Sequence, residues 1–129
     1  MNSVLIKSML ENQFGLASKN PNRSKALCYQ LPNGEAIYLK RKSSDKGAEV
    51  QPMSTAPVVI HLKHKAALMA LIAQSELRNE LEIDGKTKST GFVTLKDKDS
   101  LDGGATPTGL ALNVNSKRAL SELINLVAA

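Results

Sequence analysis

Residues 26–41 read ALCYQLPNGEAIYLKR, and this stretch decides the fold. Two runs with the composition of β-strands, 26–31 and 36–41, flank a Pro-Asn-Gly sequence at 32–34. Proline presets the φ angle of the first corner of a turn, and asparagine and glycine both tolerate positive φ. The pattern therefore predicts an antiparallel β-hairpin, in which the two runs pair across this turn.

The periodicity of the apolar residues predicts the remaining elements. Helical spacing extends over 4–14, 65–82 and 115–129. Asn2 or Ser3 is placed to cap the first of these helices, and Asn115 or Ser116 to cap the last. The long helix at 65–82 is either continuous or broken near Ser75. Because helices and strands are interspersed and the first pairing is a hairpin, the expected class is α+β. We expect one domain, 1–129, in which N-terminal, central and C-terminal helices pack on a small, mainly antiparallel sheet. Further strands are expected at 58–63, 92–96 and 110–114, and connections at 42–49, 84–91 and 98–109.

The composition favours a small protein of a reducing compartment. A chain of 129 residues that is 42% hydrophobic can bury a core without disulfides or metal. Cys28 is its one cysteine and lies in an apolar run, which favours a packed core residue and a cytoplasmic location. The N-terminus lacks the pattern of a signal peptide, and no apolar run approaches the roughly 18 residues of a membrane helix. A soluble protein is expected.

No set of residues converges on catalysis or on metal binding. His61 and His64 have no Asp, Glu or Cys at a ligand spacing, so we expect no metal site. Glu35 and Lys40 do not have the spacing of a metal-dependent nuclease site. The glycine-rich stretch 102–109 lacks the arrangement of a phosphate-binding loop and is interpreted as a turn. The sequence therefore predicts a bacterial binding module without catalytic residues and without a cofactor.

Basic residues at the end of the hairpin indicate one class of partner. The net charge is +5, and residues 1–65 carry ten Lys and Arg against four acids. Amines, guanidinium groups and hydroxyls contact phosphates, so nucleic acid is the first expected partner. Scarce aromatic residues speak against base stacking, and a solvated strand end that protects a sheet edge by its charge is the alternative. The expected phosphate contacts are Lys40, Arg41, Lys42, Ser43 and Lys46.

The central helix supports a second interpretation, which is an interface with a protein. Its core, AALMALIA at 66–73, is apolar around more of the helix than a simple surface helix requires. Leu68, Leu71 and Ile72 are the expected contacts. In this interpretation the protein is an inhibitor or immunity-type factor that binds a target protein, or it binds a second copy of itself in a homo-oligomer. A fully buried helix explains the same pattern equally well.

Two blocks of the sequence, residues 28–52 and residues 106–127, resemble the YgaC-like family of small enterobacterial proteins. CYQLPNGEAIYLKRKSSDKGAEVQP, residues 28–52, is similar to the hairpin of that family and to its following polar loop. TPTGLALNVNSKRALSELINLV, residues 106–127, is similar to its closing Pro-x-Gly, strand and Ala-Leu helix. The helix after His64 has no counterpart in that family. The resemblance implies a compact α+β domain and no activity, because no function is assigned to the family.

Overall fold

The computed structural model describes residues 1–18, 26–41, 52, 55–74, 76–88, 101–102 and 106–129. The loop expected at 42–49 and the strand expected at 92–96 lie outside these residues. The helical elements are α1 (Ser3–Ser8), the π-helical turn η1 (Met9–Gln13), the 3₁₀ turn η2 (Leu62–His64), α2 (Lys65–Gln74) and α3 (Lys117–Ala128). The strands are β1 (Ala26–Gln30), β2 (Ala36–Lys40), β3 (Val58–His61), β4 (Leu81–Lys88), β5 (Leu101–Asp102) and β6 (Thr106–Val114).

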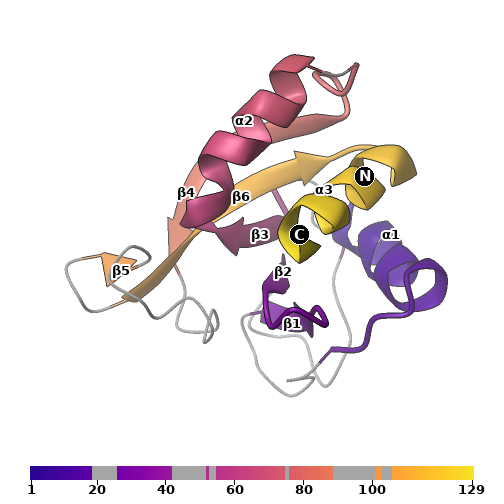
Figure 1. Ribbon diagram of the computed structural model, residues 1–129. Coiled ribbons are helices and arrows are strands. Elements are labelled where there is room, and N and C mark those ends of the chain that lie inside the picture. Colours follow the sequence, from indigo (N-terminus) through magenta and orange to yellow (C-terminus); the bar gives the residue numbers. More distant parts are fainter. Residues whose placement is uncertain (19–25, 42–51, 53–54, 75, 89–100, 103–105) are drawn as a thin grey trace.

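The fold is α+β, as the sequence predicts. The strands form one sheet in the order β1-β2-β3-β6-β4, and β5 pairs with β6 off this path. All of these pairings are antiparallel. One face of the sheet shares a continuous hydrophobic core with α1, α2 and α3 (Figure 1).

The hairpin of β1 and β2 confirms the prediction from its turn sequence. The Gly34 N–H donates to the Leu31 carbonyl at 2.9 Å, and the Leu31 N–H donates to the Glu35 carbonyl at 2.7 Å. Gly34 has a φ of +89°, and Asn33 does not adopt positive φ. A turn followed by a left-handed residue that lacks a Cβ joins the strands without steric cost. Glycine, not asparagine, is therefore the residue that the turn requires.

Alternation along the strands buries both faces of the sheet. Leu27, Ile37 and Ile60 belong to the core beneath the helices, because residues at period two share a face. Tyr38 and Val59 point to the opposite face and are also buried, in a smaller cluster that includes Cys28. Cys28 is therefore a packed residue of the sheet, as its sequence context predicts.

The first and last helices begin where their caps predict. The Asn2 Oδ1 accepts a hydrogen bond from the Leu5 N–H at 3.0 Å, and the Ser116 Oγ accepts one from the Ala119 N–H at 3.0 Å. Each side chain satisfies a backbone donor that the helix itself leaves unpaired. The helical N-terminal segment ends before Gly15, whose φ is +67°. The buried stripe of α3 comprises Ala119, Leu120, Leu123 and Val127.

The helix predicted at 65–82 ends at Gln74, next to its expected break, but the prediction of further helix and then a loop over residues 76–91 is wrong. Residues 76–80 form a turn, and β4 runs over Leu81–Lys88, where a helix end and a loop were expected. Leu77 and Leu81 continue the helical spacing, but Leu81 and Ile83 also alternate as in a strand. Pairing with β6, from Leu81–Val114 to Lys88–Thr108, decides between the two patterns. Pairing with β4 as far as Thr108, and with β5 at Thr106 and Pro107, also makes β6 begin at Thr106, earlier than the strand predicted at 110–114.

Candidate functional site

The predicted phosphate contacts are only partly within the described residues. Lys42, Ser43 and Lys46 lie outside them. Arg41 directly follows β2 and is only 5% exposed. A guanidinium group at this depth is not presented to a large polyanion, so Arg41 belongs to the folded interior.

Lys40, at the end of β2, is half-buried. Burial lowers the pKa of its amine below the usual value, and the negative charge of Asp84 acts in the opposite direction. Burial has this effect because it disfavours the charged form of an amine. The two described residues of the basic run are therefore less available to solvent than their sequence pattern predicts.

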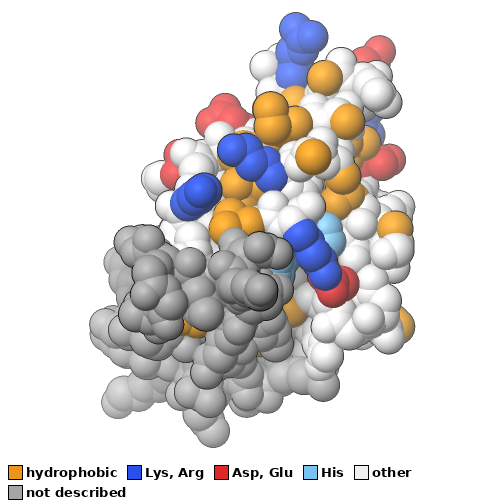
Figure 2. Space-filling model, turned by 60° about the vertical axis from the view of Figure 1, so that its left-hand side comes forward, with side chains coloured by type: hydrophobic (Ala, Val, Ile, Leu, Met, Phe, Trp, Pro, Cys, Tyr) orange, Lys and Arg blue, Asp and Glu red, His pale blue; other side chains and the backbone are white. Residues whose placement is uncertain are grey.

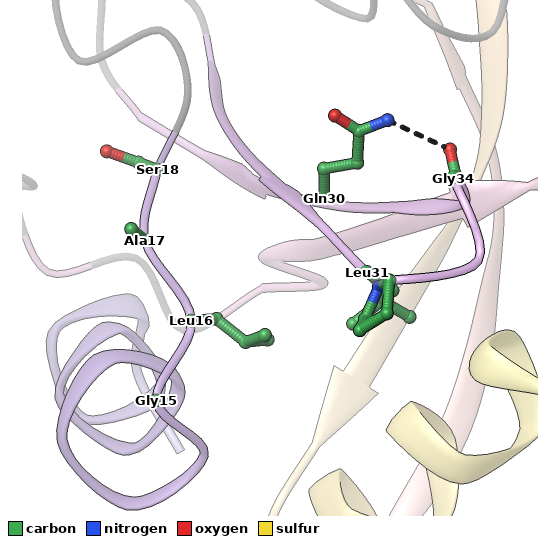
Figure 3. A pocket seen from close by; sticks show the side chains of 8 residues that line it. Gly15, Leu16, Ala17, Ser18, Gln30, Leu31 and Gly34 are labelled. Carbon is green, nitrogen blue, oxygen red and sulfur yellow. Dashed lines mark hydrogen bonds between the residues drawn. The ribbon is translucent and has the colours of Figure 1, made fainter.

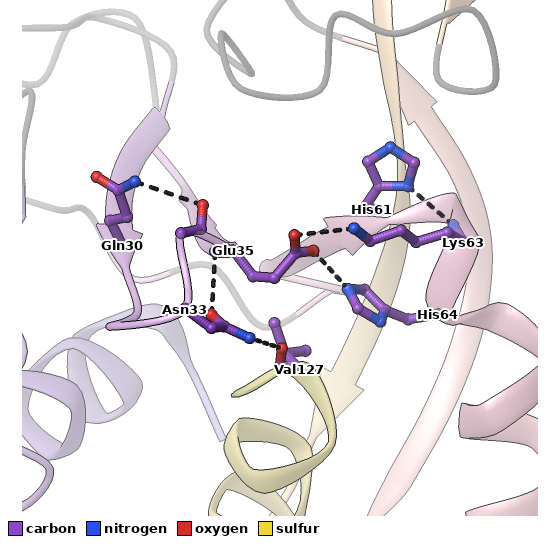
Figure 4. A network of polar contacts seen from close by, with 8 residues as sticks. Gln30, Asn33, Glu35, His61, Lys63, His64 and Val127 are labelled. Carbon is purple, nitrogen blue, oxygen red and sulfur yellow. Dashed lines mark hydrogen bonds and ion pairs between the residues drawn. The ribbon is translucent and has the colours of Figure 1, made fainter. Parts of the chain in front are cut away.

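A polar network joins the hairpin turn to the corner between β3 and α2 (Figure 4). The Lys63 Nζ donates to one Glu35 oxygen at 2.8 Å, and the His64 Nε2 lies 3.1 Å from the other. Hydrogen bonds from Lys63 lower the pKa of the Glu35 carboxyl, so the group is ionised at neutral pH. Because a carboxylate only accepts, the proton of the imidazole is on Nε2.

Neighbouring contacts in Figure 4 extend this network to the last helix. The Asn33 Nδ2 donates to the Val127 carbonyl at 3.0 Å, while the Asn33 Oδ1 accepts from the Glu35 N–H at 3.0 Å. The His61 Nδ1 accepts from the Lys63 N–H at 2.9 Å and so caps the 3₁₀ turn. The spacing of these two histidines predicts no metal site, and nothing in it indicates that Glu35 is the partner of His64. The network ties three elements together and is structural.

Stability is expected to fall in two steps as the pH is lowered, because both ionisable partners have shifted pKa values. Burial lowers the pKa of His64 below about 6.5 in the folded protein, against the opposing effect of Glu35. The unfolded chain therefore binds this proton more readily, and the stabilisation is full above pH 6.5 and is lost below it. Glu35, whose pKa is also lowered, gives a second loss below about pH 4.5.

Urea denaturation between about pH 8 and pH 3 measures both steps. His64→Gln, which has a side chain of similar polarity but no titration, is expected to lose the first step and to keep the second. If the pH profile of His64→Gln matched that of the natural protein, the histidine would not be the cause of the first step.

A groove of about 380 Å³ lies between α2 and β4. Met69, 53% exposed, is on one wall, and Ile83 of the strand is on the other. Arg78, in the turn between the two elements, also lines the groove. Figure 2 shows this side of the molecule, where hydrophobic side chains gather with Lys and Arg side chains beside them. The complete lining is Met69, Ile72, Ala73, Arg78, Leu81, Glu82 and Ile83.

The structure separates the three predicted interface residues of α2. Leu68 is 0% exposed and lies in the core, so it is not part of a surface. Leu71 and Ile72 are partly buried against that core, and Ile72 also lines the groove. The rest of the helix exposes an apolar surface, which comprises Ala66, Ala67, Met69, Ala70 and Ala73. The helix is therefore neither fully buried nor polar on its outer side.

A second hollow, of about 600 Å³, lies between the end of the N-terminal helical segment and the hairpin. Figure 3 shows Ser18 and Gln30 at its rim, with Leu16 and Leu31 on opposite sides. The Gln30 amide donates to the Gly34 carbonyl at 3.4 Å and is thus held at the hairpin. Ser18 and Gln30 are the polar side chains in its lining, and no charged residue is among the residues that line it.

Over the described part of the chain, no three His, Cys, Asp or Glu residues come together as metal ligands. None of the helices in that part has the length and hydrophobicity needed to span a bilayer. Among the described residues, no hydroxyl or thiol is hydrogen-bonded to His64.

No protein-family model, curated protein or solved structure matches the chain. The resemblance to the YgaC-like family stays a prediction. The groove between α2 and β4 combines an apolar lining with an exposed apolar helix face, and the sequence pattern did not indicate Met69, Arg78 and Ile83 as its residues. An alternating pattern in LEID, residues 81–84, is the signal that would have placed a strand beside the helix.

Proposed function

We propose that the protein is a binding module that takes a segment of a polypeptide partner on the surface formed by α2 and β4. The apolar groove between these elements carries the proposal. A groove lined by apolar side chains beside an exposed apolar helix face is typical of a protein-interaction site. This function keeps the central helix as the interface, with Ile72 and Met69 in place of Leu68.

The chemistry of the surface favours a polypeptide over nucleic acid. Nucleic acid is held by cations along the phosphate backbone and by exposed aromatic rings. One cation, Arg78, and one anion, Glu82, line the groove. Tyr29 and Tyr38 are completely buried, so neither ring is available for stacking. A peptide that places an apolar side chain in this groove therefore complements its lining better than a phosphate does.

Nucleic-acid binding by the basic run is the second proposal, and it rests on charge. Ten of the Lys and Arg residues and only four acids fall within residues 1–65. A phosphate-binding role for Lys40 and Lys46 predicts binding to single-stranded DNA, duplex DNA and RNA alike that weakens steeply with added salt. No binding at low salt would overturn this second proposal.

Two matched substitutions on α2 test the leading proposal. Ala67 and Ala73 are both exposed, but only Ala73 lines the groove. The probe is a random-peptide phage library selected on the purified full chain, followed by fluorescence titration of the enriched peptide. Ala73→Glu is expected to weaken binding of that peptide by about tenfold or more, because a charged side chain then takes the place of the peptide's apolar side chain in the groove. Ala67→Glu is expected to change the affinity less than about twofold.

Circular dichroism and thermal unfolding establish that both variants are folded. Equal effects of the two substitutions, or a library without any enriched peptide, would overturn the proposal. A dimer in sedimentation equilibrium that Ala73→Glu dissociates would make a second copy of the chain the occupant instead of another protein.

A further inference from the structure

We infer that the partner segment adds to β4 as a further strand of the sheet, and this inference rests on the function proposed above. β4 lies at one end of the sheet order, next to β6. Within the described ranges, no strand pairs with its other side. The N–H and C=O groups of such an edge are a template for an extended chain.

Hydrogen bonds at the start of β4 establish which backbone groups face this edge. The Asn115 N–H donates to the Glu80 carbonyl at 2.8 Å, one step before the pair of Leu81 and Val114. Bonded and non-bonded pairs alternate along an antiparallel ladder. Leu81 and Ile83 therefore occupy non-bonded positions, in which the backbone groups point away from β6.

The far side of β6 leads to the same assignment. The Lys40 N–H donates to the Pro57 carbonyl at 2.8 Å, so Pro57 faces β2. Because the backbone groups of successive residues point to opposite sides of a strand, the N–H and C=O of Val58 point toward β6, where Val58 is opposite Leu112. Leu112 then bonds to β3, and its partner on the other side, Ile83, faces outward. Two independent hydrogen bonds thus place the backbone of Ile83 at the open edge.

The accessible stretch of β4 is short. The Leu81 N–H already donates to the Leu77 carbonyl at 2.9 Å, which leaves only the carbonyl of Leu81. After Ile83 the register shifts, and Gly85 has a φ of +141°. An irregularity of this kind increases the local twist and limits edge-to-edge pairing. A short extended segment therefore fits this edge better than the long strand edge of a second copy.

The groove beside the edge defines the side chains of the partner. Ile83 contributes its backbone to the edge and its side chain to the groove, where it meets Met69 and Ile72 of α2. A strand added to β4 places alternate side chains over this groove. Arg78 is exposed at the groove and has no carboxylate partner among the described residues. The partner is thus an extended segment with an apolar side chain over the groove and a carboxylate within reach of Arg78.

N-methylation of the bound peptide tests strand addition with an internal control. The probe is the peptide enriched from the phage library, synthesised with single N-methyl groups at successive positions and titrated against the full chain. In an added strand every second backbone N–H points toward β4. Methylation of one of these amides is expected to weaken binding by about tenfold. Methylation at the other parity is expected to change binding less than about twofold, because those amides face away from β4. Arg78→Gln is expected to reduce the affinity for an acidic peptide and not for its amidated form.

Amide hydrogen exchange on the natural chain gives a second readout. The Ile83 amide is expected to exchange about tenfold more slowly when the peptide is bound, whereas the Val59 amide, inside the sheet, is expected to stay unchanged. A peptide that binds in the groove without dependence on methylation parity would overturn strand addition and leave the proposed function in place. A library that yields no peptide would overturn both.

Discussion

Replacing Leu68 with alanine is expected to lower the free energy of unfolding by about 2–5 kcal/mol. The Leu68 side chain is 0% exposed and packs in the core beneath α2. Its truncation removes buried methyl groups and leaves a cavity that the surrounding sheet and helices fill only in part. Denaturation by urea, monitored by circular dichroism, measures the change.

Met69→Ala is the matched control, because Met69 is the next residue of the same helix and is 53% exposed. Its effect on the free energy of unfolding is expected to stay within about 0.5 kcal/mol. Peptide binding should show the reverse order, with Met69→Ala the more damaging substitution among folded variants. If Leu68→Ala left the stability unchanged and weakened only peptide binding, Leu68 would be an interface residue. That result would contradict its place in the core.

Arg41→Ala is expected to destabilise the fold by about 1–3 kcal/mol. Arg41 is 5% exposed, and the substitution removes a polar side chain from the interior together with its interactions there. Truncation of one partner in a buried polar contact leaves the other group desolvated and unsatisfied. The measurement is again urea denaturation, combined with titration of fluorescent duplex DNA at two salt concentrations.

Arg118→Ala is the control of the same chemical type. The Arg118 Nη2 lies 3.7 Å from the Glu80 Oε2. The Arg118 side chain is 53% exposed, so solvent screens this ion pair. Its loss is expected to cost less than about 1 kcal/mol. Unchanged stability of Arg41→Ala together with a flatter salt dependence of DNA binding would identify Arg41 as a phosphate contact and would favour the second proposal.

Elements whose residues specify them locally were predictable. The hairpin was predicted because a Pro-Asn-Gly turn separates two runs of strand-forming residues, and the register of Tyr29 opposite Ile37 follows from that turn. The closing helix was predicted because Ser116 supplies a cap and an amphipathic stripe follows it. Neither element needs a distant partner to be recognised.

The candidate site was harder to predict because it is built from distant pairings. The stretch SELRNELEI, 75–83, matches a helical period, and only its pairing with β6 makes part of it a strand. The basic run shows the converse problem, since a string of charges does not reveal that Arg41 turns into the interior. The contact of Glu35 with His64 joins residues that are 29 positions apart.

The sequence by itself determined the α+β class, the hairpin, the caps of the terminal helices and the excess of charge in the first half. These features depend on backbone preferences and side-chain periods over a few neighbouring residues. Tertiary structure alone decided that α2 ends at Gln74, that β4 forms the sheet edge, and that Leu68 and Arg41 are buried. The physical reason is that pairing and burial depend on the free energy of contacts between distant segments, which overrides weak local preferences.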